Sequence, residues 1–261
     1  MKKVAILILF SLLLSSASSA GTDGQNELSK NSNGEVKDCF EQINRGIFAF
    51  NQALDQLIVE PIAKGYRYLP SPIRSGTSNF LNNLSLVVTI PNNVLQGDMG
   101  MAGKNSARLV VNSTIGILGV FDPASKIGLN DYEKEDYGQT LASWGMGEGC
   151  YLVLPVLGPS TARDTLASLA NYFGGDAWYN ITVNNDTHYV SDFDYYASVG
   201  TRGVDFRAKN LEAWDNLEKN SIDFYASVKS LYLQDRRKRI ANSDETIETL
   251  NDSDWEEIES D

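Results

Sequence analysis

The side chains of this chain that could do chemistry are few, and their spacing fits none of the common catalytic arrangements. His188 is the single histidine of the sequence, and the chain has no Gly-x-Ser-x-Gly elbow to expose a serine nucleophile. A zinc site draws on several His and Cys ligands at close spacing, and these are missing too. We therefore expect no catalysis, no bound metal and no cofactor, with His188 a simple hydrogen-bonding group in an aromatic loop.

The acidic residues are numerous, but they do not indicate a site. Paired carboxylates can hydrolyse glycosides, yet 34 acidic residues leave any such pair unidentifiable by spacing. The net charge of −12 argues against nucleic acid as a partner, because its backbone is itself negative. Nine carboxylates and no Lys or Arg lie between Asp244 and Asp261, so we expect residues 241–261 to form a solvated acidic tail.

The N-terminus has the layout of a secretory signal. Two lysines precede an apolar stretch from Val4 to Leu14, and small residues follow up to Ala20. Eleven residues are too short to cross about 30 Å of hydrocarbon as a helix. We expect residues 1–20 to be a cleaved signal peptide and residues 21–37, rich in Gly, Ser and Asn, to be a flexible linker.

The elements that would position any site are predicted to be helices within residues 38–240. Asp38 and Glu41 match a capping box, and apolar residues then recur at helical spacing. This helix should stop between Val59 and Tyr66, because Pro61 disrupts the helical hydrogen-bond pattern. Further helices are expected from Gly103 to Gly116, from Val199 to Trp214 and from Ser221 to Ile240, with short helical pieces broken by Pro91 between Arg74 and Gly97.

Two uncharged stretches, Leu109–Phe121 and Cys150–Ala162, stand out along this helical pattern. Each has thirteen residues, which would cover about 20 Å as a helix. Such a segment can enter one leaflet of a bilayer but cannot cross both. The alternative is the buried core of a water-soluble fold. The aromatic and polar segment Trp178–Tyr196 likewise suits either a lipid–water boundary or ordinary loop packing.

Three alternating glycines, Gly145, Gly147 and Gly149, lie between the two stretches. Glycine tolerates backbone angles that other residues resist, so this segment suits a hairpin or a hinge. The flanking residues Thr140–Trp144 and Tyr151–Leu154 are the candidate strands of that hairpin. An ordinary surface loop is the alternative.

Cys39 and Cys150 are the two cysteines of the chain. An exported protein enters a compartment in which disulfides form and persist. The two cysteines could therefore pair, or they could be two separate buried thiols, and their spacing does not choose between these states.

Several sequence strings, taken in order, resemble the MlaA/VacJ family of outer-membrane lipoproteins. They include Asp38–Arg45, Asn112–Gly116, Phe121–Ala124, Tyr151–Asp164 and Tyr232–Arg237. The resemblance extends from Asp38 to Ile240 and is loosest between Trp178 and Val199. It implies a ring-like, monotopic helical assembly in the inner leaflet of the outer membrane, with a central amphipathic channel and a short hairpin at its mouth.

The resemblance also implies a function and partners. Family members remove phospholipids misplaced in the outer leaflet, beside a trimeric porin, and pass them to a periplasmic lipid-carrier protein, which preserves lipid asymmetry. In this chain Gly145, Gly147 and Gly149 would be the hairpin gate, and the protein would lie at the periplasmic face of the outer membrane. The alternative is a soluble periplasmic lipid-binding or scaffold protein that lost its lipid anchor.

Two departures from the family pattern carry further expectations. The family usually has a lipid-modified cysteine directly after its signal, whereas here Ala20 is followed by Gly21. Lipid anchoring is therefore doubtful for this chain. Cys39 and Cys150 both stand where the family commonly has proline, and this coincident replacement suggests that they form a disulfide.

Overall fold

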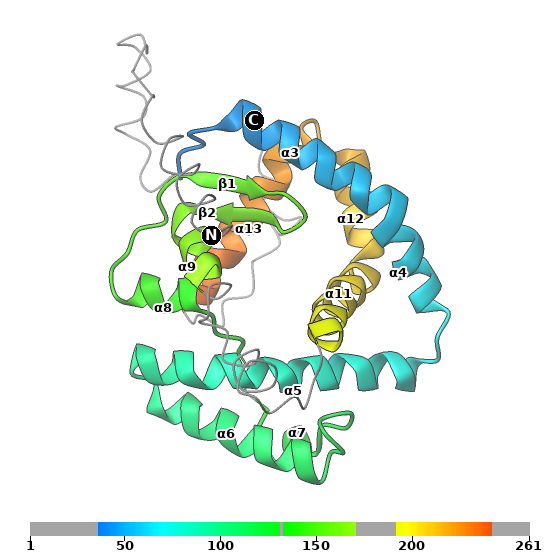
Figure 1. The fold of residues 1–261 in the computed structure, drawn as a ribbon, viewed down its shortest axis with the longest axis vertical. Coiled ribbons are helices and arrows are strands. Elements are labelled where there is room, and N and C mark those ends of the chain that lie inside the picture. The colour runs from blue at the N-terminus through cyan, green and yellow to red at the C-terminus, as the bar shows by residue number, and fades with distance from the viewer. Residues whose placement is uncertain (1–35, 131–132, 171–191, 242–261) are drawn as a thin grey trace, which may run out of the picture. The chain divides into compact units, whose positions relative to one another are not determined.

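A computed structural model describes residues 36–130, 133–170 and 192–241 of the protein. Within these residues the fold is mainly helical with one short two-stranded sheet, which confirms the expected fold class (Figure 1). None of the helices in these ranges is both long enough and apolar enough to cross a membrane. The expected signal peptide, the acidic tail from residue 242 onward and His188 lie outside the described residues.

The first helix is longer than its sequence predicts. It comprises α3 (Glu41–Leu54), a π-helical turn η1 (Asp55–Val59) and α4 (Glu60–Arg67). The helix was expected to stop between Val59 and Tyr66, and it ends at Arg67, one residue beyond that range. The expected disruption by Pro61 is wrong, because Pro61 lies in the first turn of α4, directly after the π turn, where its missing N–H breaks no helical bond. The expected capping box is also wrong. The Asp38 carboxylate accepts from Asn44 Nδ2 at 2.7 Å, and Glu41 pairs with Arg45.

A single helix of 26 residues, α5 (Ser71–Gln96), replaces the short pieces expected around Pro91. It ends at Gly97, whose φ of 84° suits glycine. The second long helix, α6 (Met99–Thr114), lies beside α5 (Figure 1), and a short α7 (Pro123–Lys126) follows. Pro91 removes only one backbone donor, and packing against α6 outweighs that loss.

The hairpin forms at a different place from the one expected. Its strands are β1 (Tyr151–Leu154) and β2 (Gly158–Thr161), which pair antiparallel with Tyr151 opposite Thr161. The expected first strand is instead part of α8 (Tyr137–Ser143), because Asp136 caps this helix by accepting from the Gln139 N–H at 3.0 Å. The next helix, α9 (Ala162–Ala170), begins directly after β2.

Three helices rather than two make up the C-terminal part of the described chain. They are α11 (Asp192–Lys209), α12 (Leu211–Asn220) and α13 (Phe224–Ala241). The helix expected from Val199 to Trp214 is interrupted at Asn210, whose side chain donates to the Phe206 carbonyl at 2.7 Å. Such a local bond competes with continuation of the helix.

An aromatic core joins α3, the hairpin and α13. Phe48, Tyr151 and Tyr225 are buried there and meet edge to face, with ring centroids 5.5 to 6.1 Å apart. Val36 is also buried in this core, and the Lys37 carbonyl accepts from the Tyr151 N–H at 2.9 Å. The packed domain therefore includes Val36, two residues before the expected start of the helical domain at Asp38.

The contacts between elements follow a closed circuit. α3 leads through η1 into α4, α4 packs on α11, and α11 packs on α5. α5 contacts α8, α8 contacts α9 and α13, and the hairpin leads back to α3 (Figure 1). This circular order agrees with the ring-like assembly that the family resemblance implies.

Candidate functional site

Helices α5 and α6 have an inverted polarity. Their buried side chains are mostly polar: Ser78, Asn83, Ser85, Thr89, Asn92, Asn93, Asn105, Arg108 and Asn112. Large apolar side chains are exposed on the same helices and on the turns that follow α6: Ile73, Val94, Leu95, Met99, Val110, Ile115, Ile117, Leu118, Val120 and Phe121. Soluble domains rarely combine buried polar groups with a large exposed apolar surface, which usually marks a binding or membrane face.

The buried polar groups are linked by hydrogen bonds across the helices. Asn105 Nδ2 donates to Asn93 Oδ1 at 2.9 Å, and the Thr140 hydroxyl donates to Asn92 Oδ1 at 2.6 Å. Burial of such groups without partners would cost free energy, so these bonds fix how α5 sits against α6 and α8.

An apolar cavity of about 650 Å³ opens between α5, α6 and α11. Its lining is Thr77, Phe80, Leu81, Asn83, Leu84, Val87, Leu109, Ser113, Leu118, Ala197, Ser198 and Thr201. The polar groups in this lining are hydroxyls and one amide, so the cavity suits an uncharged, mainly apolar group. Its size lies within the range of ordinary small-molecule sites.

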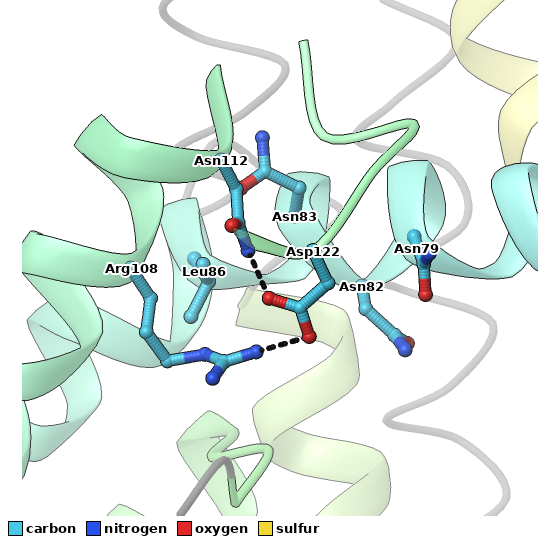
Figure 2. Close-up of a pocket in the computed structure, with 7 residues that line it drawn as sticks. All are labelled: Asn79, Asn82, Asn83, Leu86, Arg108, Asn112 and Asp122. Carbon is cyan, nitrogen blue, oxygen red and sulfur yellow. Dashed lines mark hydrogen bonds and ion pairs between the residues drawn. The ribbon is translucent and has the colours of Figure 1, made fainter. Parts of the chain in front are cut away.

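A small polar pocket lies on the other side of Asn83, which lines both spaces. Figure 2 shows its members, with Asp122 bonded to Arg108 at 2.9 Å and to Asn112 at 2.9 Å. The pocket holds about 20 Å³, room for roughly one water molecule. Burial alone would raise the pKa of Asp122, but hydrogen bonds from Ser125, Asn112 and Arg108 outweigh it and lower that pKa.

The polar pocket holds the strained turns after α6 in place. Ile117 and Leu118 have φ of 53° and 56°, a left-handed conformation that is rare for a β-branched residue such as Ile117. Asn83 Nδ2 donates to the Leu118 carbonyl at 3.3 Å, and a Cβ added at Gly119 would lie 2.4 Å from Asn83 Cβ. Strain of this kind costs about 1–3 kcal/mol per residue and is common at functional sites.

A second polar cluster joins α8, α9 and α13. Arg236 Nη1 lies 2.6 Å from Asp136 Oδ2, and Arg236 Nε lies 2.8 Å from Asp164 Oδ2. A cavity of about 240 Å³ borders the cluster. Burial would raise the pKa of Asp136 and of Asp164, but their hydrogen bonds with Arg236 lower both pKa values below 3.8. A Cβ added at Gly138 would come within 2.4 Å of Asp164 Oδ1, so this close packing needs glycine.

Two asparagines of α3 hold the edge of the hairpin. The Asn44 side chain donates to the Tyr151 carbonyl at 3.0 Å and accepts from the Val153 N–H at 2.9 Å. The Asn51 side chain likewise donates to the Leu154 carbonyl at 2.8 Å and accepts from the Val156 N–H at 2.7 Å. A Cys39–Cys150 disulfide, with Cα atoms 5.6 Å apart, ties the same helix start to the residue before β1.

The three candidate gate glycines lie in the connection from α8 to β1, outside the hairpin itself. Gly145 and Gly149 have φ of 89° and 70°, and a Cβ on Gly149 would lie 2.9 Å from Ala162 Cβ. Gly147 has open space around its Cα. Of the three, Gly145 and Gly149 thus depend on glycine for conformation, while Gly147 does not.

The site residues do not assemble into a metal centre. Among the described residues, no group of three or more His, Cys, Asp or Glu side chains is placed to hold an ion. The polar networks around Asn83 and Arg236 were not expected from the sequence. For the network around Asn83 a signal was present in the asparagines of α5, which form hydrogen bonds across helices. The network around Arg236 has no local signal, because its partner Asp136 lies 100 residues away in the sequence.

The fold and this site define a class of protein: a mainly helical domain in which α5 and α6 bury polar side chains, expose apolar ones and border an apolar cavity. The sequence matches the MlaA lipoprotein family over residues 36–239, so the chain belongs to that family.

Named relatives and a solved structure agree with this assignment. The Escherichia coli K12 intermembrane phospholipid transport system lipoprotein MlaA is 33% identical over 250 residues, which cover 93% of this chain and 90% of that one. An uncharacterized Rickettsia bellii protein is 36% identical over 217 residues, or 81% of each chain. A solved structure from work on the structural basis for maintenance of bacterial outer membrane lipid asymmetry has a TM-score of 0.66 and 31% identity. It covers 78% of this chain and 99% of that one.

Proposed function

We propose that this protein transports phospholipid between membranes and maintains outer-membrane asymmetry by removing misplaced phospholipids from the outer leaflet. The observation that carries this proposal is the inverted polarity of α5 and α6 around an apolar cavity. Apolar side chains on the outside suit surrounding hydrocarbon, and polar groups inside give a headgroup a place to stay hydrogen-bonded. A phospholipid needs such a path because an unpaired charge in an apolar medium is costly.

The proposed route is a central amphipathic channel within the circuit of helices. The cavity between α5, α6 and α11 would take acyl chains, and the polar groups beside it would face headgroups. The exposed apolar residues of α6 and its following turns would place the protein in the inner leaflet at the periplasmic face of the outer membrane. The proposed partners are a trimeric porin, which would lie beside the protein, and a periplasmic lipid-carrier protein, which would receive the phospholipid.

The gate is assigned to Gly145, Gly147 and Gly149 in the α8–β1 connection. The hairpin is held to α3 by Asn44 and Asn51, so movement is easier in the glycine connection than in the strands. Glycine is the residue that absorbs large backbone changes at least steric cost.

A soluble periplasmic lipid-binding or scaffold protein is the second candidate. The observation that favours it is Cys39, the first cysteine in the sequence, which is joined to Cys150 and cannot carry a lipid while that bond exists. Membrane fractionation separates the two candidates. Recovery of the mature protein with the soluble periplasm, together with normal surface lipid in a deletion strain, would favour the second.

The test of function is outer-leaflet phospholipid content in a strain that lacks the gene and receives variants. Leu84→Trp fills the cavity and should leave outer-leaflet phospholipid high, whereas Val94→Trp, on the exposed face of the same helix, should restore asymmetry. Gly147→Pro should impair the gate, and Gly147→Ala, which fits the open space there, should not. Normal asymmetry in the deletion strain itself would rule out the proposed function.

A further inference from the structure

A serine hydroxyl lines the apolar cavity. Ser113, on α6, is one of the lining residues, and its Oγ accepts a hydrogen bond from Asn83 Nδ2 at 3.0 Å. Among residues 36–130, 133–170 and 192–241, the Ser113 hydroxyl donates to no acceptor. Because a hydroxyl can accept hydrogen bonds and also donate one, the proton of Ser113 is available to an acceptor in the cavity.

Two other hydroxyls of α6 are bonded within the helix. Ser106 Oγ donates to the Ala102 carbonyl at 2.7 Å, and Thr114 Oγ1 donates to the Val110 carbonyl at 2.7 Å. A bond to the carbonyl four residues earlier is a common local bond for a serine or threonine inside a helix. Ser113 does not form this bond in the described structure, so its hydroxyl differs from those two in having a proton to donate to a ligand.

The surroundings of Ser113 in the cavity are mainly apolar. Phe80, Leu84 and Val87 line it from one face of α5, and Leu109 lines it from α6, one helical turn before Ser113. The described residues of the lining include no Lys, Arg, Asp or Glu. A phosphate would lose hydration here without gaining a counter-charge, which is costly. An ester carbonyl oxygen is uncharged and accepts a hydrogen bond, so it suits both the hydroxyl and the apolar walls.

We propose that the Ser113 hydroxyl donates a hydrogen bond to an ester carbonyl oxygen of a phospholipid whose acyl chain lies in the cavity between α5, α6 and α11. This inference rests on the proposed function and adds the group of the lipid that the cavity recognises. The acyl chain packs against Phe80, Leu84 and Leu109, while the bond from Asn83 Nδ2 holds Ser113 Oγ in position. The cavity therefore prefers ester lipids to ether lipids, in which a methylene group replaces the carbonyl.

The test compares a diester phosphatidylglycerol with the diether lipid that has the same head group and chain length. Binding to the full-length mature protein is measured by calorimetry in non-ionic detergent. The unaltered protein should bind the diester about fivefold more tightly, since one neutral hydrogen bond contributes roughly that factor. Ser113→Ala should weaken binding of the diester by the same factor and leave binding of the diether unchanged. Ser113→Thr, which keeps a hydroxyl, should retain the preference for the diester.

Ser106→Ala is the matched control, because the Ser106 hydroxyl is bonded to Ala102 within α6, and this variant should keep the preference. Equal binding of the two lipids by the unaltered protein, or no binding of either, overturns the ester contact. A preference that survives in Ser113→Ala also overturns it. Equal loss of both lipids in Ser113→Ala shows damage to the cavity and contradicts the proposal. Transport itself fails only on the deletion-strain measurement of outer-leaflet phospholipid, so the two failures are distinguishable.

Discussion

The hairpin region and the α5–α6 region differ in the kind of side chain that they bury. Around the hairpin, Phe48, Tyr151 and Tyr225 are buried against one another, and a disulfide joins α3 to the start of β1. In α5 and α6 the buried side chains are mostly amides and hydroxyls, and valines, leucines and isoleucines face outward. The first region is packed as a protein packs in water, while the second suits a surrounding of lower polarity.

This difference indicates that the two regions have different roles. An aromatic core, paired ions and a covalent bond make the hairpin region rigid, so it can hold the glycine connection in a defined position. The α5–α6 region leaves a cavity open because its inner groups bond to each other rather than fill space with apolar side chains. Three changes test this contrast.

The largest effect is expected from removing the disulfide. The double variant Cys39→Ala, Cys150→Ala should lose about 4 kcal/mol of unfolding free energy, because the bond closes a loop of 111 residues in the unfolded chain. Denaturant unfolding measures this loss. Hydrogen exchange should speed up most in α3 and β1, which lie beside the removed bond. Two free thiols in the unreduced, unaltered protein would contradict the pairing.

A somewhat smaller effect is expected from Arg236→Met. This change leaves the Asp136 and Asp164 carboxylates without their buried partner and should cost about 3 kcal/mol. Arg239→Met, which removes an exposed arginine of the same helix, should change stability by less than about 0.5 kcal/mol. Equal effects of the two changes in chemical denaturation would show that the cluster is not a stabilising one.

The Arg236 cluster also determines whether the protein gains or loses stability as the pH falls. Asp136 and Asp164 have folded-state pKa values below 3.8, so near and below that pH the unfolded chain binds more protons than the folded one. Their contribution is present above pH 3.8 and is lost as pH falls through the folded-state pKa values. The unaltered protein should therefore lose stability over this range more steeply than Arg236→Met does.

The smallest effect on stability, with a clear effect on location, is expected from Val110→Lys. Val110 is 62% exposed on α6, so the change should leave unfolding in detergent within about 0.5 kcal/mol of the unaltered protein. It should lower the membrane-bound fraction, because a charge would replace apolar surface in contact with hydrocarbon. Ile222→Lys, at an exposed site between α12 and α13, is the control and should not change that fraction. Equal fractions for both would contradict a membrane role for the α6 face.

Much of the fold could be predicted, and the errors share one cause. Pro61 and Pro91 were expected to end helices, yet a π turn accommodates the first and packing against α6 outweighs the second. The turn of the hairpin was expected at the three glycines before β1, but it lies between Leu154 and Gly158, after β1. The three glycines are the stronger local signal for a turn. Predictions from local sequence consider each residue only with its neighbours along the chain. In this protein the positions of the helix ends and of the hairpin depend on contacts with residues far away in the sequence.

The sequence by itself determined the helical class, the family and the uncharged stretches, because periodicity, residue order and absence of charge are properties of the chain. Tertiary structure decided which side of each helix faces inward, since that depends on partners a hundred or more residues away in the sequence. It brought Asn44 to Tyr151, Arg236 to Asp136 and Arg202 to Leu81. Hydrogen bonds and ion pairs act over a few ångströms of space, and separation along the chain does not reveal that distance.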